Sequence, residues 1–206
     1  MNKATAKVVD PALWVPECYD VVKKDSSIIG IGVVRPKIFA DNKKSVYNNQ
    51  IFSFYLDLIH ALENRGHDWQ IFCNGGDGDW EFAEKLYSAL GKPFGKLAEY
   101  PKTTKDLVNI ISGYKAVVAG RLHAVISATA LDIPALGIVW ADKFDYFQQD
   151  FKLEKFIHPK DFVHPEQIVE RLECSIEKGV DENNKNLLKS QTYKILQKEL
   201  CECLKG

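Results

Sequence analysis

The stretch Val117-Val118-Ala119-Gly120-Arg121-Leu122-His123-Ala124 contains a transition that recurs along this chain. Its first residues form a short apolar run, which is typical of a strand buried on both faces. Gly120 then permits a tight turn, and the small apolar residues that follow predict a buried helix over 122–131. Strand, turn and helix in this order make up one unit of a parallel α/β fold.

The same alternation extends from this stretch in both directions. Four short apolar runs are predicted strands, at 28–34, 69–73, 116–119 and 135–140. Weaker strands are expected near 96–99 and 155–158. Besides 122–131, longer stretches with apolar residues at helical spacing are predicted helices, at 48–65, 79–90, 104–113, 142–151, 164–178 and 182–204. We therefore predict an α/β fold with a Rossmann-like parallel sheet and helices on both faces.

The periodicity also suggests how the chain is divided. Residues 1–25 fit the pattern least well, and we expect them to be a lead-in or remnant segment. Residues 26–180 are expected to form the Rossmann-like ligand-binding domain, and residues 181–206 a C-terminal helix.

Charge and composition exclude several classes of protein. The 206 residues include 27 Lys+Arg and 28 Asp+Glu, a net charge of −1, which argues against a generic nucleic-acid or anionic-membrane binder. No stretch approaches the roughly 20 apolar residues of a membrane helix, and no apolar segment follows the N-terminal lysines as in a secretory signal. Five scattered cysteines favour reduced thiols over a disulfide framework, so we expect a cytoplasmic protein.

Charged residues follow the predicted strands where ligands bind to open parallel sheets. Arg121 and His123 come directly after one strand, in the first turn of a helix whose free N–H groups favour an anion. Arg121 adds a bidentate positive charge, and His123 can exchange a proton near neutral pH. Arg35 follows another strand, where it could clamp a phosphate or carboxylate, and Lys143 could extend the same crevice.

Each of these residues also has a purely structural interpretation. Arg121 would then pair with an acid, and His123 would be a satisfied, half-buried histidine. Arg35 and Lys143 would be solvated surface residues. The combination of Arg121, His123 and a helix N-terminus after a buried strand favours the anion site over these separate interpretations.

Other types of site are disfavoured. Gly30-Ile31-Gly32 resembles the start of a dinucleotide fingerprint, but Arg35 stands in place of the third glycine. Cys201 and Cys203 lie two residues apart and would point about 200° from each other on a helix, so we expect no metal there or elsewhere. The acidic segment 74–79 lacks the ligand periodicity of a calcium loop and is interpreted as a polar turn.

The stretch from Val117 to Lys143 resembles the C-terminal half of the polysaccharide pyruvyl transferase family. The resemblance extends over roughly residues 8–160. Its motifs occur in the family's order: Asp10-Pro11-Ala12-Leu13, Ile29-Gly30-Ile31-Gly32-Val33-Val34-Arg35-Pro36, Arg121-Leu122-His123-Ala124, Ile133-Pro134-Ala135-Leu136-Gly137-Ile138, and Lys143.

The resemblance implies one domain of a two-domain, GT-B-like transferase. Such enzymes transfer pyruvate from phosphoenolpyruvate to sugar hydroxyls, often as a cyclic ketal on a cell-envelope polysaccharide or its lipid-linked precursor. By analogy, the donor would be bound by Arg35, Arg121, the backbone of Leu122, His123 and Lys143, with His123 also catalytic. Phosphoenolpyruvate is then a donor substrate, and no cofactor is expected.

Only nine residues precede Asp10, so we expect the acceptor-facing N-terminal half to be absent and a partner chain or self-association to supply it. The acceptor would be a sugar or a lipid-linked saccharide. Two alternatives remain open at this point: a sugar-nucleotide glycosyltransferase half-domain of the same architecture, or a non-catalytic interaction module.

Overall fold

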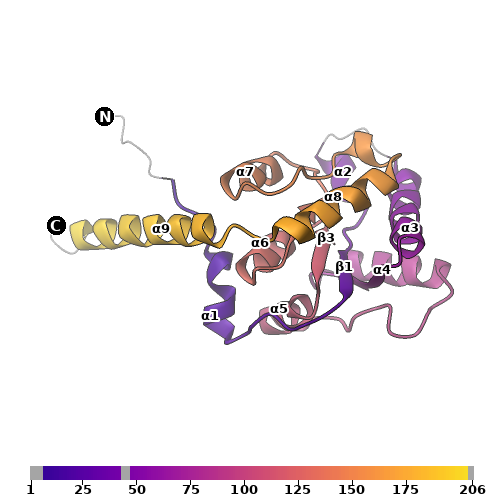
Figure 1. Ribbon diagram of the computed structural model, residues 1–206, viewed down its shortest axis with the longest axis horizontal. Helices are drawn as coiled ribbons and strands as arrows, with labels where there is room; N and C mark the ends of the chain where they lie inside the picture. Colours follow the sequence, from indigo (N-terminus) through magenta and orange to yellow (C-terminus); the bar gives the residue numbers. More distant parts are fainter. Residues whose placement is uncertain (1–6, 43–46, 204–206) are drawn as a thin grey trace.

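The computed structural model describes residues 7–42 and 47–203 and has an α/β architecture (Figure 1). Within these residues a single parallel sheet has the strand order β2-β1-β3-β4. Its strands are β1 (Ile28–Gly32), β2 (Asp68–Phe72), β3 (Ala116–Ala119) and β4 (Ala135–Gly137). Isolated bridges extend its two edges, Ile71 with Leu97 and Ile138 with Ile157. The predicted parallel sheet is confirmed, and both weak strands appear as single bridges.

The longer helices are confirmed to within a few residues of their predicted bounds. They are α3 (Asn48–Asn64), α4 (Asp77–Ala89), α5 (Thr104–Ser112), α6 (Leu122–Ala130), α7 (Lys143–Asp150), α8 (Pro165–Lys178) and α9 (Glu182–Cys203). Shorter ones were not predicted: η1 (Pro11–Trp14), α1 (Val15–Tyr19), α2 (Lys37–Asp41) and η2 (Pro159–Asp161). Elements of one turn or slightly more are too short for a hydrophobic period to develop.

The strand order places a topological switch point between β1 and β3. From β1 the chain moves outward to β2, then crosses back to β3 and continues in the other direction to β4. Right-handed crossovers in opposite directions place their helices on opposite faces of the sheet. Accordingly, α3 packs against α8, while α6 packs against α5 and η1. Gly32 and Ala119 are register partners, so the loops after β1 and β3 leave the sheet side by side.

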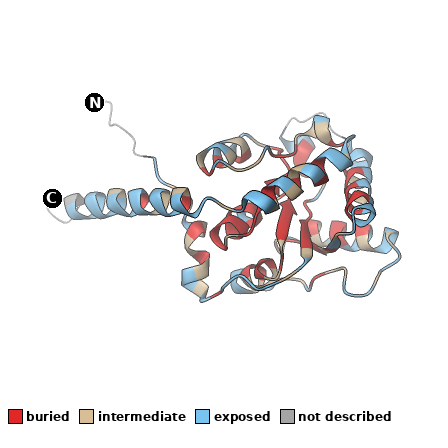
Figure 2. Ribbon diagram, viewed as in Figure 1, coloured by how far each residue is buried: buried red, intermediate tan, exposed pale blue. Residues whose placement is uncertain are grey.

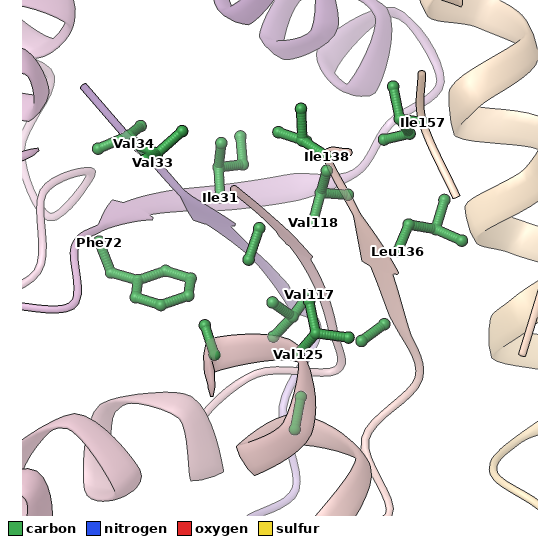
Figure 3. Packing of buried hydrophobic residues seen from close by; sticks show 14 of the residues in the cluster. Ile31, Val33, Val34, Phe72, Val117, Val118, Val125, Leu136, Ile138 and Ile157 are labelled. Atoms are coloured by element: carbon green, nitrogen blue, oxygen red, sulfur yellow. The ribbon is translucent and has the colours of Figure 1, made fainter. Parts of the chain in front are cut away.

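The core forms between these layers (Figure 3). Ile29, Ile31, Val33 and Val34 are fully buried, as expected for a strand covered on both faces. The glycines of β1 provide room for aromatic rings, because a Cβ on Gly32 would lie 2.7 Å from the Phe72 ring. This packing accounts for a Gly-x-Gly pattern without a dinucleotide.

The lead-in segment and the start of α9 lie beside α6. Leu13 of η1 is fully buried, and η1 contacts α6. The start of α9 is bonded to the same region through Lys185, whereas over residues 193–201 its side chains are largely exposed (Figures 1 and 2). Residues 1–6 of the predicted lead-in and 204–206 of the predicted C-terminal helix lie outside the described residues.

Candidate functional site

The candidate site lies at the switch point, at the carboxyl end of the sheet. Arg35 lies three residues beyond the end of β1, and Arg121 lies two residues beyond the end of β3. Because those strands are adjacent and in register, the structure brings the two loops together. The sequence analysis expected this from the rule that ligands bind at the carboxyl ends of the strands in an open parallel sheet.

Both loops converge on Asp79, a residue of the first turn of α4 that is 1% exposed. Arg121 binds it in bidentate fashion, with Nε donating to Oδ2 at 2.7 Å and Nη2 donating to Oδ1 at 2.9 Å. The backbone N–H of Arg35 also donates to Oδ1, at 2.9 Å. A buried charge is tolerated when it is paired and hydrogen-bonded, and this carboxylate meets both conditions. The structural interpretation of Arg121, pairing with an acid, is thus realised.

The pairing leaves part of the Arg121 guanidinium free for another ligand. Nε and one Nη2 hydrogen face Asp79, and the remaining N–H groups, including both on Nη1, are not used in that pair. The side chain is 28% exposed. The Arg35 side chain is 48% exposed, and its Nη2 lies 3.9 Å from Asp41 Oδ2. Two arginine side chains therefore reach the surface from adjacent loops.

Leu122 and His123 occupy the first turn of α6, for which Arg121 is the N-cap residue. The Arg121 side chain does not cap this helix, and the N–H groups of Leu122 and His123 have no acceptor within it. The His123 side chain is 67% exposed, and its Nε2 lies 3.7 Å from Asp10 Oδ2. Asp10 comes from the lead-in segment, where its other oxygen accepts the Ala12 N–H and caps η1. The lead-in thus contributes a carboxylate beside His123.

Lys143 is connected to the same turn through an aromatic side chain. Its Nζ lies 4.5 Å from the centre of the Trp140 ring, within the range of a cation–π contact. The Trp140 indole N–H donates to the Gly120 carbonyl oxygen at 2.6 Å. Lys143 therefore lies near the Arg121 turn, with its charge facing an aromatic ring.

Three contributors were missed at the level of sequence: Asp79, Asp10 and Trp140. The segment 74–79 was interpreted as a polar turn and Asp79 also as the first residue of the helix 79–90. The helix is confirmed, but neither interpretation predicted that Asp79 is buried and paired with an arginine. Its only sequence signal is an acidic residue in the first turn of a predicted helix, directly after a strand. Such a residue faces the edge of the sheet where ligands bind.

The buried side chains of Tyr55 and Cys73 lie close to Asp79 and Arg121. Burial raises the pKa of the Tyr55 hydroxyl and of the Cys73 thiol above their ordinary values. Within the described part of the chain, the Tyr55 hydroxyl and Asn74 Oδ1 have no hydrogen-bond partner. Neither Tyr55 nor Cys73 is accessible to a ligand, since each is at most 1% exposed.

A pocket of about 470 Å³ opens beside the Arg35 loop. It is lined by Pro36, Asn48, Asn49, Phe52, Gly78, Glu81, Phe82 and Lys85.

Across residues 7–42 and 47–203, no group of three or more His, Cys, Asp or Glu side chains is arranged to hold a metal ion. The helices in that part of the chain include none that combines the length and apolarity needed to cross a membrane.

The fold and the site define a parallel α/β protein with cationic side chains gathered at its switch point. A sequence model of the polysaccharide pyruvyl transferase family matches residues 5–142, about two thirds of the chain, and the protein belongs to this family. This match confirms the family that the sequence motifs indicated. The expectation that the chain resembles only the C-terminal half of the family was wrong. A search of curated protein sequences finds no match to this chain.

Proposed function

We propose that this chain binds phosphoenolpyruvate at the switch point and transfers its pyruvyl group to a sugar hydroxyl of a cell-envelope polysaccharide. Membership of the polysaccharide pyruvyl transferase family supports the type of reaction. The observation that carries the proposal is the placement of Arg121, at the head of α6 with one edge fixed by Asp79 and the other at the surface.

The charge of the donor fits this arrangement. Phosphoenolpyruvate carries a phosphate and a carboxylate, and each is recognised best by an arginine. Arg121 would bind one anionic group with help from the backbone N–H groups of Leu122 and His123, and Arg35 would bind the other. Lys143 would add positive charge at the rim.

The reaction requires one new carbon–oxygen bond at each of two steps. In the first, a sugar hydroxyl oxygen bonds to the enol carbon, the carbon–carbon double bond becomes a single bond, and the terminal methylene takes up one proton as the hydroxyl gives up its own. In the second, a neighbouring hydroxyl displaces phosphate from the same carbon and closes the ketal, and its proton leaves with the phosphate. His123 would assist proton transfer from the attacking hydroxyl.

The proposal is tested by titrating the purified chain with phosphoenolpyruvate in a calorimeter, alongside inorganic phosphate, pyruvate and a nucleotide diphosphate-sugar. We expect phosphoenolpyruvate to bind more tightly than phosphate or pyruvate, because each of these presents only one of its anionic groups. Arg121→Gln should weaken this binding about a hundredfold or more, so that the residual binding is measurable only at high ligand concentration. Arg65→Gln, which changes an arginine paired with Glu173 between α3 and α8, should leave it intact.

Two results would contradict the proposal. One is phosphoenolpyruvate binding that is unaffected by Arg121→Gln. The other is a preference for the nucleotide diphosphate-sugar, which would favour a glycosyltransferase-type donor. Binding without any saccharide-dependent release of phosphate would reject the transfer step while retaining the donor site.

A further inference from the structure

Asp79 holds parts of two separate loops with a single carboxylate. It accepts two N–H groups from the Arg121 side chain, after β3, and one from the Arg35 backbone, after β1. Asp79 itself lies in α4, the helix that follows β2. Segments that follow three different strands therefore meet at this carboxylate. The positive end of the α4 dipole lies at the same turn and favours the negative charge.

We propose that Asp79 is a positioning residue for the anion site, holding the Arg121 guanidinium and the Arg35 loop in their binding arrangement before a ligand arrives. The inference rests on the proposed function, since it concerns the same site, and it assigns to Asp79 a role that the family resemblance did not include.

The geometry favours positioning over direct contact with a ligand. Asp79 is 1% exposed, and both of its oxygens are engaged by the loops that it holds. A carboxylate would also repel the phosphate and carboxylate of the donor. Asp79 therefore acts through Arg121 and Arg35 and does not contact the reacting atoms.

The two arginines are held differently. The Arg121 side chain is fixed at its guanidinium, so its conformational entropy is already lost in the free protein. Arg35 is fixed at its backbone, whereas its side chain is 48% exposed and forms a long ion pair, 3.9 Å, with Asp41. Arg121 is thus a pre-organised contact, whereas Arg35 adapts to the ligand.

Asp79→Asn is the most direct test, because it keeps the size of the side chain but removes the charge and one acceptor oxygen. We expect phosphoenolpyruvate to bind this variant about tenfold more weakly or worse, by calorimetry on the full chain. Glu173→Gln is the matched control. It breaks another two-bond carboxylate–arginine pair, with Arg65, away from the switch point, and should leave the affinity unchanged.

A double-mutant cycle separates positioning from general damage to the fold. If Asp79 acts chiefly through Arg121, Asp79→Asn should cause a clearly smaller loss of affinity in an Arg121→Gln chain, whose residual binding is measured at high ligand concentration. Only its hold on the Arg35 loop then remains to be lost. An equal loss in both backgrounds would overturn the inference, as would an Asp79→Asn chain that binds as tightly as the wild type or more tightly. An unchanged affinity for Arg121→Gln alone would instead reject the proposed donor site.

A measurement on the wild-type chain covers the case in which Asp79→Asn does not fold. The ¹⁵N relaxation of the arginine Nε–H groups reports side-chain motion on the picosecond to nanosecond timescale. Without ligand, the Arg121 Nε–H should be as rigid as the backbone, and the Arg35 Nε–H should be mobile. An Arg121 side chain as mobile as that of Arg35 would overturn the inference.

Discussion

The Arg121 guanidinium serves both the fold and the candidate site. Its inner edge neutralises the buried Asp79, and its outer edge remains at the surface. A structural role and a binding role are therefore not alternatives for this residue. The hydrogen bonds to Asp79 hold the guanidinium plane, and they thereby fix the direction in which its unpaired N–H groups point.

Replacing Arg121 with lysine should show the structural part of this role. Lys keeps the charge but cannot donate two parallel hydrogen bonds, so we expect Arg121→Lys to lower the free energy of unfolding by about 1–3 kcal/mol. Arg35→Lys, at a side chain that is half exposed, should cost less than about 0.5 kcal/mol. Urea denaturation measures both values, and equal losses would contradict the structural role of Arg121.

Asp10 should affect catalysis more than donor binding. Its carboxylate lies 3.7 Å from His123 Nε2, where it can orient the ring toward the attacking hydroxyl. Under the proposed function, Asp10→Asn should slow saccharide-dependent phosphate release about tenfold, with little change in phosphoenolpyruvate affinity.

The design of this variant limits damage to the fold. Asn is a good N-cap residue, so Asp10→Asn retains the capping of η1. Asp20→Asn is a suitable control, since Asp20 is exposed and has a left-handed backbone that Asn also adopts. If the two variants have the same rate, Asp10 has no role in the reaction.

At the scale of elements, the sequence predicted most where a local pattern repeats. The apolar spacings that predict α3 and α5 are each complete within a few residues, and both elements appear as expected. The order of the strands and the Asp79–Arg121 pair depend on residues far apart in the chain. No local periodicity contains that information, so the site was predicted as two arginines without the acid that joins them.

The contact between α3 and α8 provides a prediction about pH. Arg65, at the end of α3, and the nearby His67 both bond Glu173 of α8. These hydrogen bonds, chiefly the one from Arg65, lower the pKa of Glu173 to about 2 from its ordinary value of 4.5. A carboxyl group with a lowered pKa contributes stability above its unfolded pKa and loses that contribution as pH falls toward its folded pKa.

The stability difference between the wild type and Glu173→Gln should therefore be constant above about pH 5 and shrink between about pH 4.5 and pH 2. It should not exceed about 1 kcal/mol, because the pair is partly exposed. Urea denaturation at several pH values measures it. A difference that grows as the pH falls would contradict this assignment.

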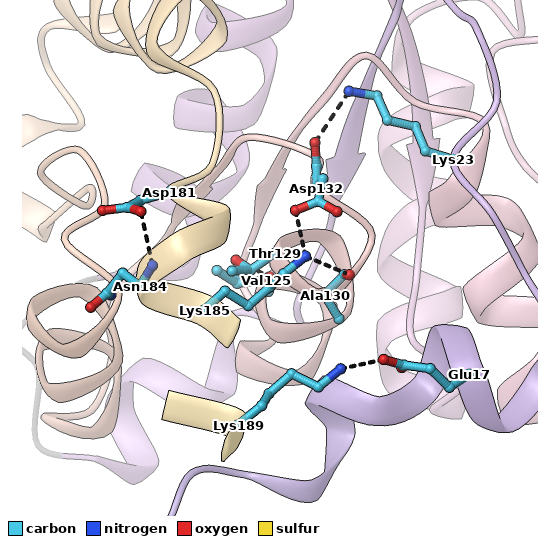
Figure 4. A network of polar contacts seen from close by, with 10 residues as sticks. All are labelled: Glu17, Lys23, Val125, Thr129, Ala130, Asp132, Asp181, Asn184, Lys185 and Lys189. Atoms are coloured by element: carbon cyan, nitrogen blue, oxygen red, sulfur yellow. Dashed lines mark hydrogen bonds and ion pairs between the residues drawn. The ribbon is translucent and has the colours of Figure 1, made fainter. Parts of the chain in front are cut away.

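At the scale of the whole molecule, the two ends of the chain stabilise each other on one side of the sheet. Polar contacts from α9 reach the α6 region and the lead-in segment (Figure 4). A further contact reaches the end of α7. The pairs are Lys185 with Asp132 and the Ala130 carbonyl oxygen, Lys189 with Glu17, Asn184 with the Asp150 carbonyl oxygen, and Thr192 with the Val9 N–H. The segment interpreted as a remnant is thus held between α6 and α9.

Lys185 should be the critical residue of this attachment. It is 6% exposed, and its ammonium group bonds both Asp132 and the Ala130 carbonyl oxygen at the end of α6. Lys185→Ala removes both bonds and leaves the carbonyl oxygen without this partner, so we expect a loss of about 1–3 kcal/mol in the free energy of unfolding. Because α9 also holds the lead-in, hydrogen exchange should accelerate at the Val9 amide as well as in the first turns of α9.

Lys194→Ala is the matched control, since Lys194 lies on the exposed part of the same helix. It changes the same kind of side chain and should alter neither the stability nor the exchange at Val9. If Lys185→Ala accelerates exchange in α9 but leaves Val9 protected, the lead-in is held by α6 alone. In that case the coupling between the two ends of the chain is absent, and the position of Asp10 beside His123 does not depend on α9.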